Sequence, residues 1–458
     1  MIDANFAPAY FEAHKQQILD DYFTLIRFPS IGANPKHLGD CSKAATWLKN
    51  FLKPLGFQCE LITPKTGLPV PVLFAERAGD ENSTSVLFYG HYDVQPEDPV
   101  ELWNTPPFEP TLKDGRVYAR GAQDDKGQFF SFLYGMKALI EAGEKIPPIK
   151  ILLEGEEENG SYAISSLIPE LAPRIKADVL LVADTSAAPD DRPAVIAGLR
   201  GVQHFMISLT GPKQDVHSGV HGGLAPNPAQ GIATLLASLY NPDGSIAVEG
   251  FCDGIQPPSE KELAFAHESQ ETPEEYEAAI GCPPEGGTKG MDMTLRGCFE
   301  PSLEINGVHS GYGGPGSKTI IPSCAIAKLS VRLVPDQSPA HVFASIKKHL
   351  EDHCPRGMKL EIKEAFEGLP GFRFPLDSPI FNLATDVLSK LDPRGAVFRW
   401  EGASIPVVSQ LKAVSGAAPL LVGFGREGDN IHSPNESYGL DQFLRCMTWS
   451  SLILKELA

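Results

Sequence analysis

The chain has 458 residues and a formal net charge of −19, with 42% hydrophobic and 21% charged residues. This length exceeds what one hydrophobic core ordinarily supports, so we expect two or three domains. Proteins that bind duplex nucleic acid need a basic surface to replace phosphate counterions, so the acidic balance argues against a nucleic-acid partner. No run of about 18 apolar residues occurs, so we expect no membrane span.

The N-terminal segment and the cysteines favour the cytoplasm. The first 27 residues lack the basic segment and apolar run of a secretory signal. The eight cysteines are scattered and none stands in a C-x-x-C pair. In a chain of this length, that pattern is typical of reduced thiols rather than of a disulfide framework.

The first part of the chain alternates helix and strand patterns. Apolar residues at helical spacing predict helices over residues 10–25, 41–55 and 127–142. Apolar, strand-like runs cover residues 70–75, 85–89, 149–154 and 179–184. The alternation predicts the α/β class, with a mostly parallel sheet flanked by helices. Such sheets bind ligands at the carboxyl ends of their strands.

The pattern changes after residue 201. Strand-like runs and two helical patterns cover residues 202–210, 226–240, 317–335, 339–351 and 358–364. They predict an inserted α+β domain, residues 201–372. Within it, residues 251–297 are rich in Glu, Pro and Gly and have weak periodicity, so we interpret them as a long excursion that serves as a lid. Helix and strand patterns then return, which makes the first domain discontinuous, residues 1–200 with 373–458.

Polar residues follow the predicted strand ends. His91 comes after an apolar run, and Asp93 is placed to accept the second ring N–H of a ligating histidine. Asp124 and Asp125 open a helix, whose N-terminus stabilises a carboxylate that could bridge two cations. Asp184 ends another apolar run, and His432 stands in a loop near the C-terminus.

A run of glutamates strengthens the case for cations. Residues 154–158 (EGEEE) hold four glutamates in five positions, and such carboxylates repel one another unless cations neutralise them. The run could instead be a solvated surface, but it follows an apolar strand pattern, which argues against free exposure. Any one of these polar groups alone is more often a cap or a turn residue than a ligand. Their shared placement at the strand ends and loops of one α/β pattern predicts a metal site.

The motifs resemble those of the M20 metallopeptidases, a family that includes carnosinase-type dipeptidases and N-acyl-amino-acid deacylases. The resemblance runs nearly end to end and in the family's motif order. Its three motifs match His91-Tyr92-Asp93, residues 118–127 (YARGAQDDKG) and residues 154–161 (EGEEENGS).

The resemblance implies a role for each motif residue. One metal would be bound by His91 and Asp184, and the other by Glu158 and His432. Asp124 would bridge the two ions, Glu157 would be the general base, and Asp93 would orient His91. Two registers stay open, because a slip of one residue would exchange Asp124 for Asp125, or move the Glu157–Glu158 pair to include Glu156. The implied cofactors are two divalent ions; we expect zinc, with manganese or cobalt as alternatives.

The inserted domain is expected to complete the site. Residues 215–220 resemble the family's lid motif, in which a histidine reaches the active site of the partner subunit. The resemblance implies a homodimer through the insert, with His217 as oxyanion stabiliser and His221 as its near competitor. Thr319, Arg332 and Ser404 match positions that contact substrate. A guanidinium pairs bidentately with a carboxylate, although Arg332 could equally be a strand-surface charge.

Residues 93–96 (DVQP) and the segment around Trp103 resemble the dipeptidase branch of the family. The expected function is therefore hydrolysis of dipeptides with a free C-terminal carboxylate by metal-activated water. The alternative within enzymes is an N-acyl-amino-acid amidohydrolase that uses the same metals. A non-catalytic, metal-stabilised binding protein would be expected to lose ligands or Glu157, and this sequence keeps all of them.

Overall fold

The computed structural model describes residues 3–65, 67–80, 82–364, 368–402 and 405–458. It divides into two compact units. The first consists of Met1–Ala197, Pro375–Arg399 and Pro406–Ala458, and the second of Gly198–Phe374 with Trp400–Ile405. The sequence pattern predicts divisions after residues 200 and 372, whereas the units divide after residues 197 and 374 and residues 400–405 join the second unit.

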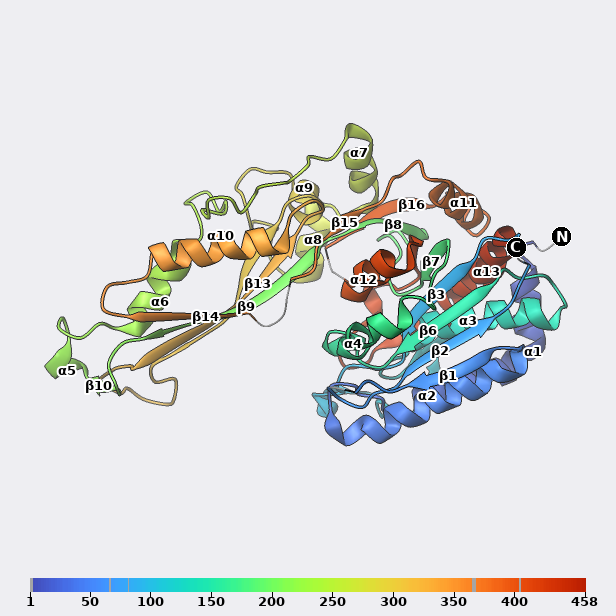
Figure 1. The fold of residues 1–458 in the computed structure, drawn as a ribbon, viewed down its shortest axis with the longest axis horizontal. Helices are drawn as coiled ribbons and strands as arrows, with labels where there is room; N and C mark the ends of the chain where they lie inside the picture. The colour runs from blue at the N-terminus through green and yellow to red at the C-terminus, as the bar shows by residue number, and fades with distance from the viewer. Residues whose placement is uncertain (1–2, 66, 81, 365–367, 403–404) are drawn as a thin grey trace. The chain divides into compact units, whose positions relative to one another are not determined.

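The first unit is built on a mixed sheet with the strand order β1-β2-β6-β3-β7-β17-β8 (Figure 1). Its strands are β1 (Gln58–Ile62), β2 (Val72–Arg77), β3 (Val86–His91), β6 (Ile149–Glu154), β7 (Val179–Val182), β8 (Ala194–Leu199) and β17 (Ala418–Gly423). The four central strands, β6, β3, β7 and β17, are parallel. The outer strands pair antiparallel. The α/β class is confirmed, and the parallel part of the sheet is its centre.

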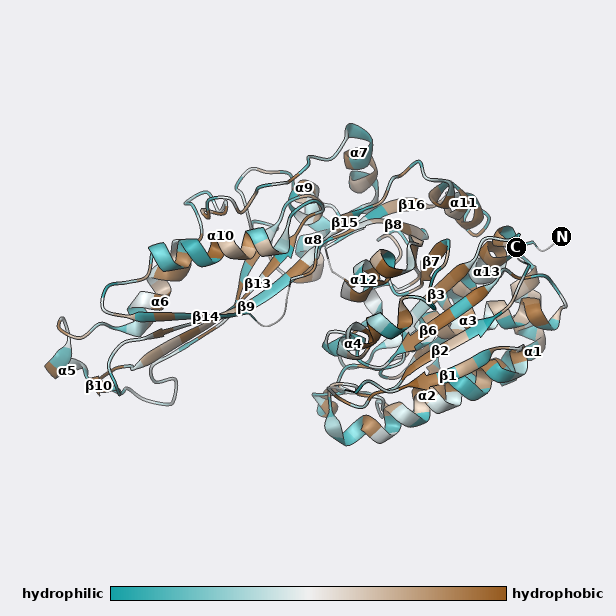
Figure 2. Cartoon of the chain, in the orientation of Figure 1, coloured by the Kyte–Doolittle hydropathy of each residue, from teal (hydrophilic) through white to brown (hydrophobic). Residues whose placement is uncertain are grey.

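Helices cover this sheet and bury its apolar strands. The helices of the first unit are α1 (Phe6–Ile26), α2 (Leu38–Leu52), α3 (Lys126–Glu141), α4 (Tyr162–Leu171), α11 (Pro379–Leu388), α12 (Pro406–Ser415) and α13 (Leu440–Leu457). Helices α1, α3 and α13 pack against one another, and Phe132 of α3 stacks on Phe88 of β3. All six residues of β3 are buried, and Figure 2 shows hydrophobic colouring along the central strands. A separate three-stranded sheet with the order β18-β5-β4 combines β4 (Thr111–Lys113) and β5 (Arg116–Tyr118) with β18 (Ser437–Gly439).

The second unit is an α+β fold around a four-stranded antiparallel sheet with the order β11-β13-β9-β14. Its strands are β9 (Gly201–Thr210), β11 (Ser302–Ser310), β13 (Cys324–Leu333) and β14 (Lys359–Glu364). Alternate residues of β9 and β13 are buried against α6 (Pro228–Ala237) and α10 (Pro339–Asp352), as the period of a half-buried strand requires. A short ladder joins β10 (Val216–His217) to β12 (Ile320–Ile321), and α5 (Ser218–His221) follows β10. Strands β15 (Phe372–Arg373) and β16 (Val397–Glu401) pair with β8.

Residues 251–297, interpreted from the sequence as an irregular excursion, contain three short helices. These are α7 (Glu260–Ser269), α8 (Pro273–Ile280) and α9 (Met293–Cys298). Helices α7 and α8 each begin with a complete capping box, formed by Ser259 with Glu262 and by Thr272 with Glu275. The capping signal was present in the sequence, but the weak apolar periodicity of the two helices concealed it.

In the part of the chain that the structure describes, none of the helices combines the length and the apolar character that crossing a bilayer requires.

Candidate metal centre

The four parallel strands at the centre of the sheet deliver the predicted ligands to one edge. His91 is the last residue of β3, and Asp184 comes two residues after β7. Glu157 and Glu158 open the turn that follows β6, and His432 lies in the loop that follows β17. Because carboxyl ends of adjacent parallel strands meet at one edge of the sheet, residues far apart in sequence converge there.

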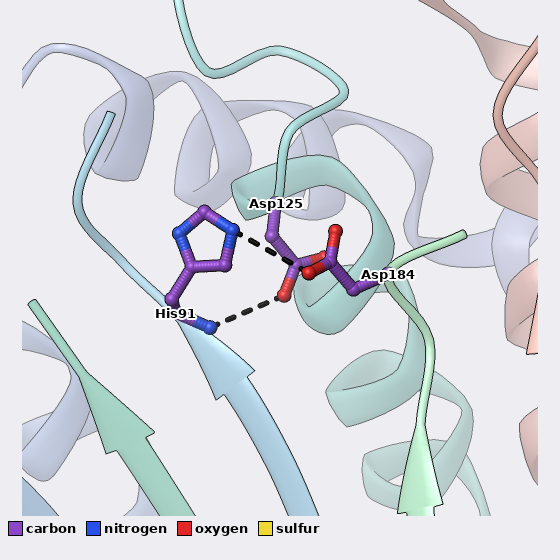
Figure 3. A group of neighbouring side chains, drawn as sticks. All are labelled: His91, Asp125 and Asp184. Carbon is purple, nitrogen blue, oxygen red and sulfur yellow. Dashed lines mark hydrogen bonds and ion pairs between the residues drawn. The ribbon is translucent and has the colours of Figure 1, made fainter. Parts of the chain in front are cut away.

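His91 is buried and touches three carboxylates. Its Nδ1 lies 3.3 Å from Oδ1 of Asp93, and its Nε2 lies 3.1 Å from Oδ1 of Asp124 and 3.6 Å from Oδ2 of Asp184. Figure 3 shows the ring pointing toward Asp184, with the carboxylate of Asp125 beside the His91 backbone. The Nδ1 contact leaves Nε2 facing the carboxylates, which is the orientation that a ligating imidazole needs.

Asp124 spans two groups of potential ligands. While one of its oxygens faces His91, the other lies 3.0 Å from Nε2 of His432. The same His432 nitrogen lies 3.2 Å from Oε2 of Glu158. The ligand atoms of Asp124, Glu158 and His432 lie within 4.8 Å of one another, as do those of His91, Asp125 and Asp184. The arrangement therefore offers two adjacent ligand sets with the Asp124 carboxylate between them.

Asp125, the alternative in the open register, has a different environment. Its Oδ2 accepts a hydrogen bond from the backbone N–H of His91 at 3.2 Å. Its Oδ1 is buried and has no hydrogen-bond partner. The geometry thus favours Asp124 as the bridging carboxylate, and it gives Asp125 a place beside His91 and Asp184.

Asp93 joins the two halves of the site. Besides facing His91, its carboxylate accepts the backbone N–H groups of Glu157 at 3.2 Å and of Glu158 at 3.1 Å. The side chain of Gln95 donates to Oε2 of Glu158 at 2.8 Å. One buried carboxylate therefore orients His91 and also holds the turn that carries the two glutamates.

The carboxylates of the site carry more negative charge than the protein alone compensates. Burial raises the pKa of Glu157 to about 8, and the neighbouring carboxylates of Glu158, Asp93 and Asp124 add to the effect. Burial and Asp125 together raise the pKa of Asp184 well above its ordinary value. The pKa of Glu158 is raised by burial and then by Asp124. A cluster of imidazole nitrogens and carboxylate oxygens with this charge excess fits divalent cations, which would neutralise it.

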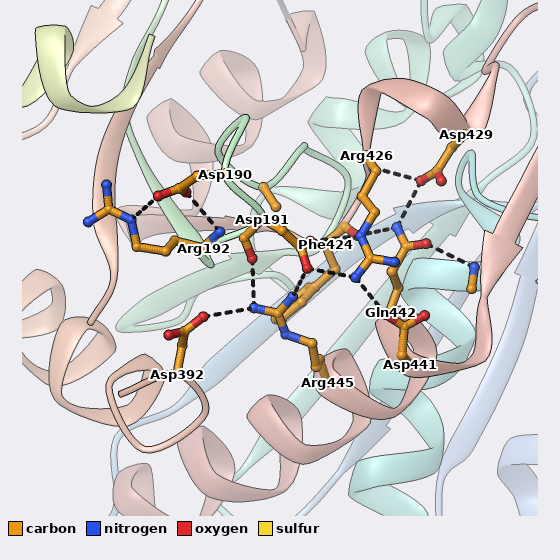
Figure 4. A network of polar contacts seen from close by, with 12 residues as sticks. Asp190, Asp191, Arg192, Asp392, Phe424, Arg426, Asp429, Asp441, Gln442 and Arg445 are labelled. Carbon is orange, nitrogen blue, oxygen red and sulfur yellow. Dashed lines mark hydrogen bonds and ion pairs between the residues drawn. The ribbon is translucent and has the colours of Figure 1, made fainter. Parts of the chain in front are cut away.

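A polar network holds the segment that carries His432 (Figure 4). The Arg426 guanidinium makes two hydrogen bonds of 2.7 Å to the carboxylate of Asp191 and one of 2.5 Å to Asp441. Asp429 accepts the backbone N–H of Arg426 at 2.7 Å and the amide of Gln442 at 2.9 Å. The turn just before His432 is thereby tied to α13 and to the loop before β8.

The structure places His217 and Thr319 together in the second unit. His217 pairs with Ile320 in the ladder of β10 and β12, and the N–H of Ser218 donates to the carbonyl of Thr319 at 3.0 Å. The Nδ1 of His217 accepts the N–H of Gly219 at 3.0 Å. This bond leaves the ring proton on Nε2, where it can be donated to another group.

Arg332 lies at the opposite end of the same unit. It is the ninth residue of β13, whose first residue, Cys324, stands three positions after Ile321, the end of β12. At the rise of a strand, the eight steps from Cys324 to Arg332 span about 27 Å. A dipeptide is at most about 7 Å long. His217 and Arg332 of one chain therefore cannot contact the same dipeptide.

Ser404, the remaining residue predicted to contact substrate, lies outside the described residues.

Two residues that contact the site were not predicted for that role. Gln95 appeared only as a marker of the dipeptidase branch, and Glu436 was not singled out. Glu436 is buried, and its carboxylate accepts the backbone N–H of Asp124 at 3.1 Å. An acidic residue in a polar loop is ordinarily solvated, so the sequence carried no signal for this contact.

Comparisons with known proteins identify the family of the chain. The sequence profile of peptidase family M20/M25/M40 matches residues 87–456. A Cys-Gly metallodipeptidase of Saccharomyces cerevisiae is 30% identical over 392 residues, which are 83% of this chain and 81% of that protein. A human beta-Ala-His dipeptidase is 30% identical over 376 residues, 81% of this chain and 74% of that protein. The solved structure of an M20 family metallo-carboxypeptidase from Sulfolobus solfataricus superposes with a TM-score of 0.84 at 28% identity, covering 96% of this chain and 99% of the other. The chain therefore belongs to peptidase family M20/M25/M40.

Proposed function

We propose that the protein is a two-metal dipeptidase that hydrolyses the amide bond of dipeptides with a free C-terminal carboxylate. The observation that carries the proposal is the Asp124 carboxylate, whose two oxygens lie 3.1 and 3.0 Å from the ring nitrogens of His91 and His432. Both curated relatives described above are named for dipeptide hydrolysis, which supports the same substrate class here.

The ligand atoms suggest how two divalent ions would be held. His91 and Asp184 would bind one ion, Glu158 and His432 the other, and Asp124 both. Imidazole nitrogens with carboxylate oxygens suit zinc, which we propose as the native ion, with manganese or cobalt as alternatives. Two divalent ions held in this way would lower the pKa of a bound water and polarise the scissile carbonyl.

The chain's own residues supply proton transfer and orientation. Glu157 takes a proton from the attacking water and passes it to the leaving amine. Its backbone is held by Asp93, which also orients His91, so the base and the ligand are positioned by one carboxylate.

The second unit would bind the substrate and complete the site as a lid and dimerisation domain, residues 201–372. We assign the substrate carboxylate to Arg332, Thr319 and Ser404, and the oxyanion of the tetrahedral intermediate to the Nε2–H of His217. Thr319 lies beside His217, so it would reach the substrate of Arg332 together with His217, from the partner chain. The span of β13 supports a homodimer, because His217 and Arg332 can meet one dipeptide only if they come from different chains. The scattered cysteines support a cytoplasmic location.

The test is a substrate panel with metal-stripped protein to which zinc, manganese or nothing is added. We expect metal-dependent release of free amino acids from dipeptides such as Ala-Ala. Cleavage of N-acetyl or N-succinyl amino acids in place of dipeptides would move the protein to the amidohydrolases and contradict the proposed substrate. Release of the C-terminal residue from tripeptides as well would widen the class to carboxypeptidases, as in the Sulfolobus neighbour's name.

A further inference from the structure

Glu436 links the two loops that carry Asp124 and His432. It stands four residues after His432 and directly before β18, whose Ser437 pairs with Tyr118 of β5. The backbone pairing continues one step further, since the N–H of Ala119 donates to the carbonyl of Glu436 at 3.0 Å. The short β5–β18 ladder thus fixes where the Glu436 side chain begins.

The Glu436 carboxylate is enclosed by four donors of the turn before α3. Oε2 accepts from Nη1 of Arg120 at 2.8 Å and from the N–H of Gly121 at 2.9 Å. Oε1 accepts from the N–H of Gln123 at 2.9 Å and of Asp124 at 3.1 Å. Each carboxylate oxygen can accept about two hydrogen bonds, so these four donors engage both oxygens.

The turn is shaped to receive an anion. Gly121 has a φ of +77°, and an added Cβ there would meet Cγ1 of Val94 at 2.5 Å, so only glycine fits. With this conformation, successive N–H groups point to one side and form an anion-binding concavity. Glu436 is about 1% exposed, so water does not compete for these donors. Burial raises the pKa of Glu436, while Arg120 and the N–H groups oppose that change.

No neutral side chain of the same size can replace this carboxylate. A glutamine offers one acceptor oxygen, and its NH₂ group would face two donors that it cannot satisfy. An aspartate keeps the charge but is shorter by one methylene, so it cannot reach all four donors. Both substitutions should therefore displace the turn that presents Asp124.

We propose that Glu436 is a positioning residue that holds the Asp124 carboxylate in register with His432 and thereby sets the affinity for the metal pair. The inference rests on the proposed two-metal site and deepens it. Residues behind metal ligands typically change metal affinity about 10–100-fold when they are substituted. Here one side chain serves two ligands, since its own segment carries His432 and its acceptor atoms hold the Asp124 turn.

The experiment measures binding of Zn²⁺ or Mn²⁺ alone, without peptide, by competition with a chelator and by counting bound ions. Glu436→Gln and Glu436→Asp are compared with Leu454→Ala, a fully buried residue of α13 that serves as a destabilised control. We expect Glu436→Gln to bind at least one ion about tenfold or more weakly. Glu436→Asp should lie between it and wild type, and Leu454→Ala should bind both ions as wild type does.

Circular dichroism of the metal-free variants establishes that they are folded. If Glu436→Gln does not fold, the inference is tested by comparing the ion affinity of Glu436→Asp with that of Leu454→Ala. Wild-type ion affinity and stoichiometry in a folded Glu436 variant would overturn the inference, and so would an equal loss in Leu454→Ala. Because ion binding is measured without substrate, the role of Glu436 can be judged even if the protein does not hydrolyse dipeptides. An absence of ion binding by the wild-type chain would instead overturn the proposed metal site.

Discussion

At the residue scale, adjacent glutamates of one turn are proposed to do different work. The carboxylate of Glu158 is committed to its neighbours, because it accepts from Gln95 at 2.8 Å and lies 3.2 Å from His432. Glu157 shares the same backbone anchor, Asp93, and has a pKa raised to about 8 by burial and its carboxylate neighbours. The distinction can be tested by the same change at both positions.

Glu157→Gln should lower kcat about 10²–10⁴-fold while the protein keeps both ions, because it removes only the proton acceptor. Glu158→Gln should lower metal content, because it replaces an anionic ligand by a neutral amide. Steady-state kinetics at saturating metal, with metal analysis of the same samples, separates the two effects. A Glu157→Gln protein with full activity would disprove the proposed base.

A second pair of substitutions addresses the open register at the bridging carboxylate. Asp124 contacts both His91 and His432, whereas Asp125 accepts the backbone N–H of His91. We therefore expect Asp124→Asn to weaken binding of both ions and Asp125→Asn to have the smaller effect. Burial holds the pKa of Asp125 well above its ordinary value, so a neutral amide resembles its protonated state. Calorimetric zinc titration of both variants measures this, and the reverse order of losses would assign the bridge to Asp125.

Strand ends predicted from apolar runs were enough to single out His91, Asp184 and the glutamate run, and the structure brings these groups together. Their roles stay predictions. The sequence could not indicate Glu436, because its importance lies in four donors that meet only in the folded chain. For the same reason, the backbone bonds of Asp93 to the glutamate turn were invisible in the sequence.

At the element scale, long helices and central strands were predictable because burial imposes a clear period on them. The runs at residues 149–154 and 339–351 correspond closely to β6 and α10. Short or atypical elements were not predicted. Helix α4 contains Pro169, the strands β4, β5 and β18 have three residues each, and the helices of residues 251–297 depend on caps rather than on an apolar face.

Close contact between α3 and α13 depends on a glycine. A Cβ on Gly135 would overlap the backbone carbonyl of Met447 and the hydroxyl of Ser450. We expect Gly135→Ala to lower the free energy of unfolding by about 1–3 kcal/mol, because the two helices must move apart. Gly39 of α2 is the matched control, since nothing lies within 4 Å of a Cβ there. Gly39→Ala should be neutral or stabilising by up to about 1 kcal/mol. Urea unfolding of both variants tests the contrast, and equal effects would contradict the packing argument.

Asp392, which Figure 4 shows beside Arg445, makes stability depend on acid. Hydrogen bonds from Arg394, with Arg445 nearby, lower the pKa of Asp392 to about 2. An unfolded Asp titrates near about 3.9, so the ion pair contributes fully above that pH and its contribution is lost as the pH falls toward 2. The stability difference between wild type and Asp392→Asn should therefore shrink from pH 5 to pH 2.5. Urea unfolding across this range measures it, and a constant difference would contradict the assignment. In a protein that already carries Arg394→Gln, Asp392→Asn should lower the free energy of unfolding by less, because the main partner of Asp392 is then absent.

At the scale of the whole molecule, the chain offers its proposed substrate groups at two ends of one strand. About 27 Å of β13 separates the His217 end from Arg332, so geometry within the second unit requires another chain if both act on one dipeptide. Homodimers with two-fold symmetry supply this, because each site then receives the same residues from its partner. From the sequence, this exchange is implied only by the resemblance of residues 215–220 to the family's lid motif, because the distance that requires it depends on the length of a folded strand.

Two heterodimers with differently tagged chains distinguish exchange between subunits from action within one chain. In the first, one chain carries Glu157→Gln and the other His217→Ala. If His217 acts on the partner's site, one complete site remains and activity is about half that of wild type. If it acts within its own chain, no site is complete.

The second heterodimer pairs a wild-type chain with one that carries both substitutions, and its outcomes are reversed. Action on the partner's site leaves no complete site, because the wild-type chain lacks the partner's His217 and the other chain lacks its base. Action within one chain leaves the wild-type chain fully active. We expect the first heterodimer to be active and the second inactive, measured as dipeptide hydrolysis per mole of dimer. The opposite result, or chains that never form a dimer, would contradict the exchange of His217 between subunits. Given the length of β13, it would also contradict the proposal that His217 and Arg332 act on one dipeptide.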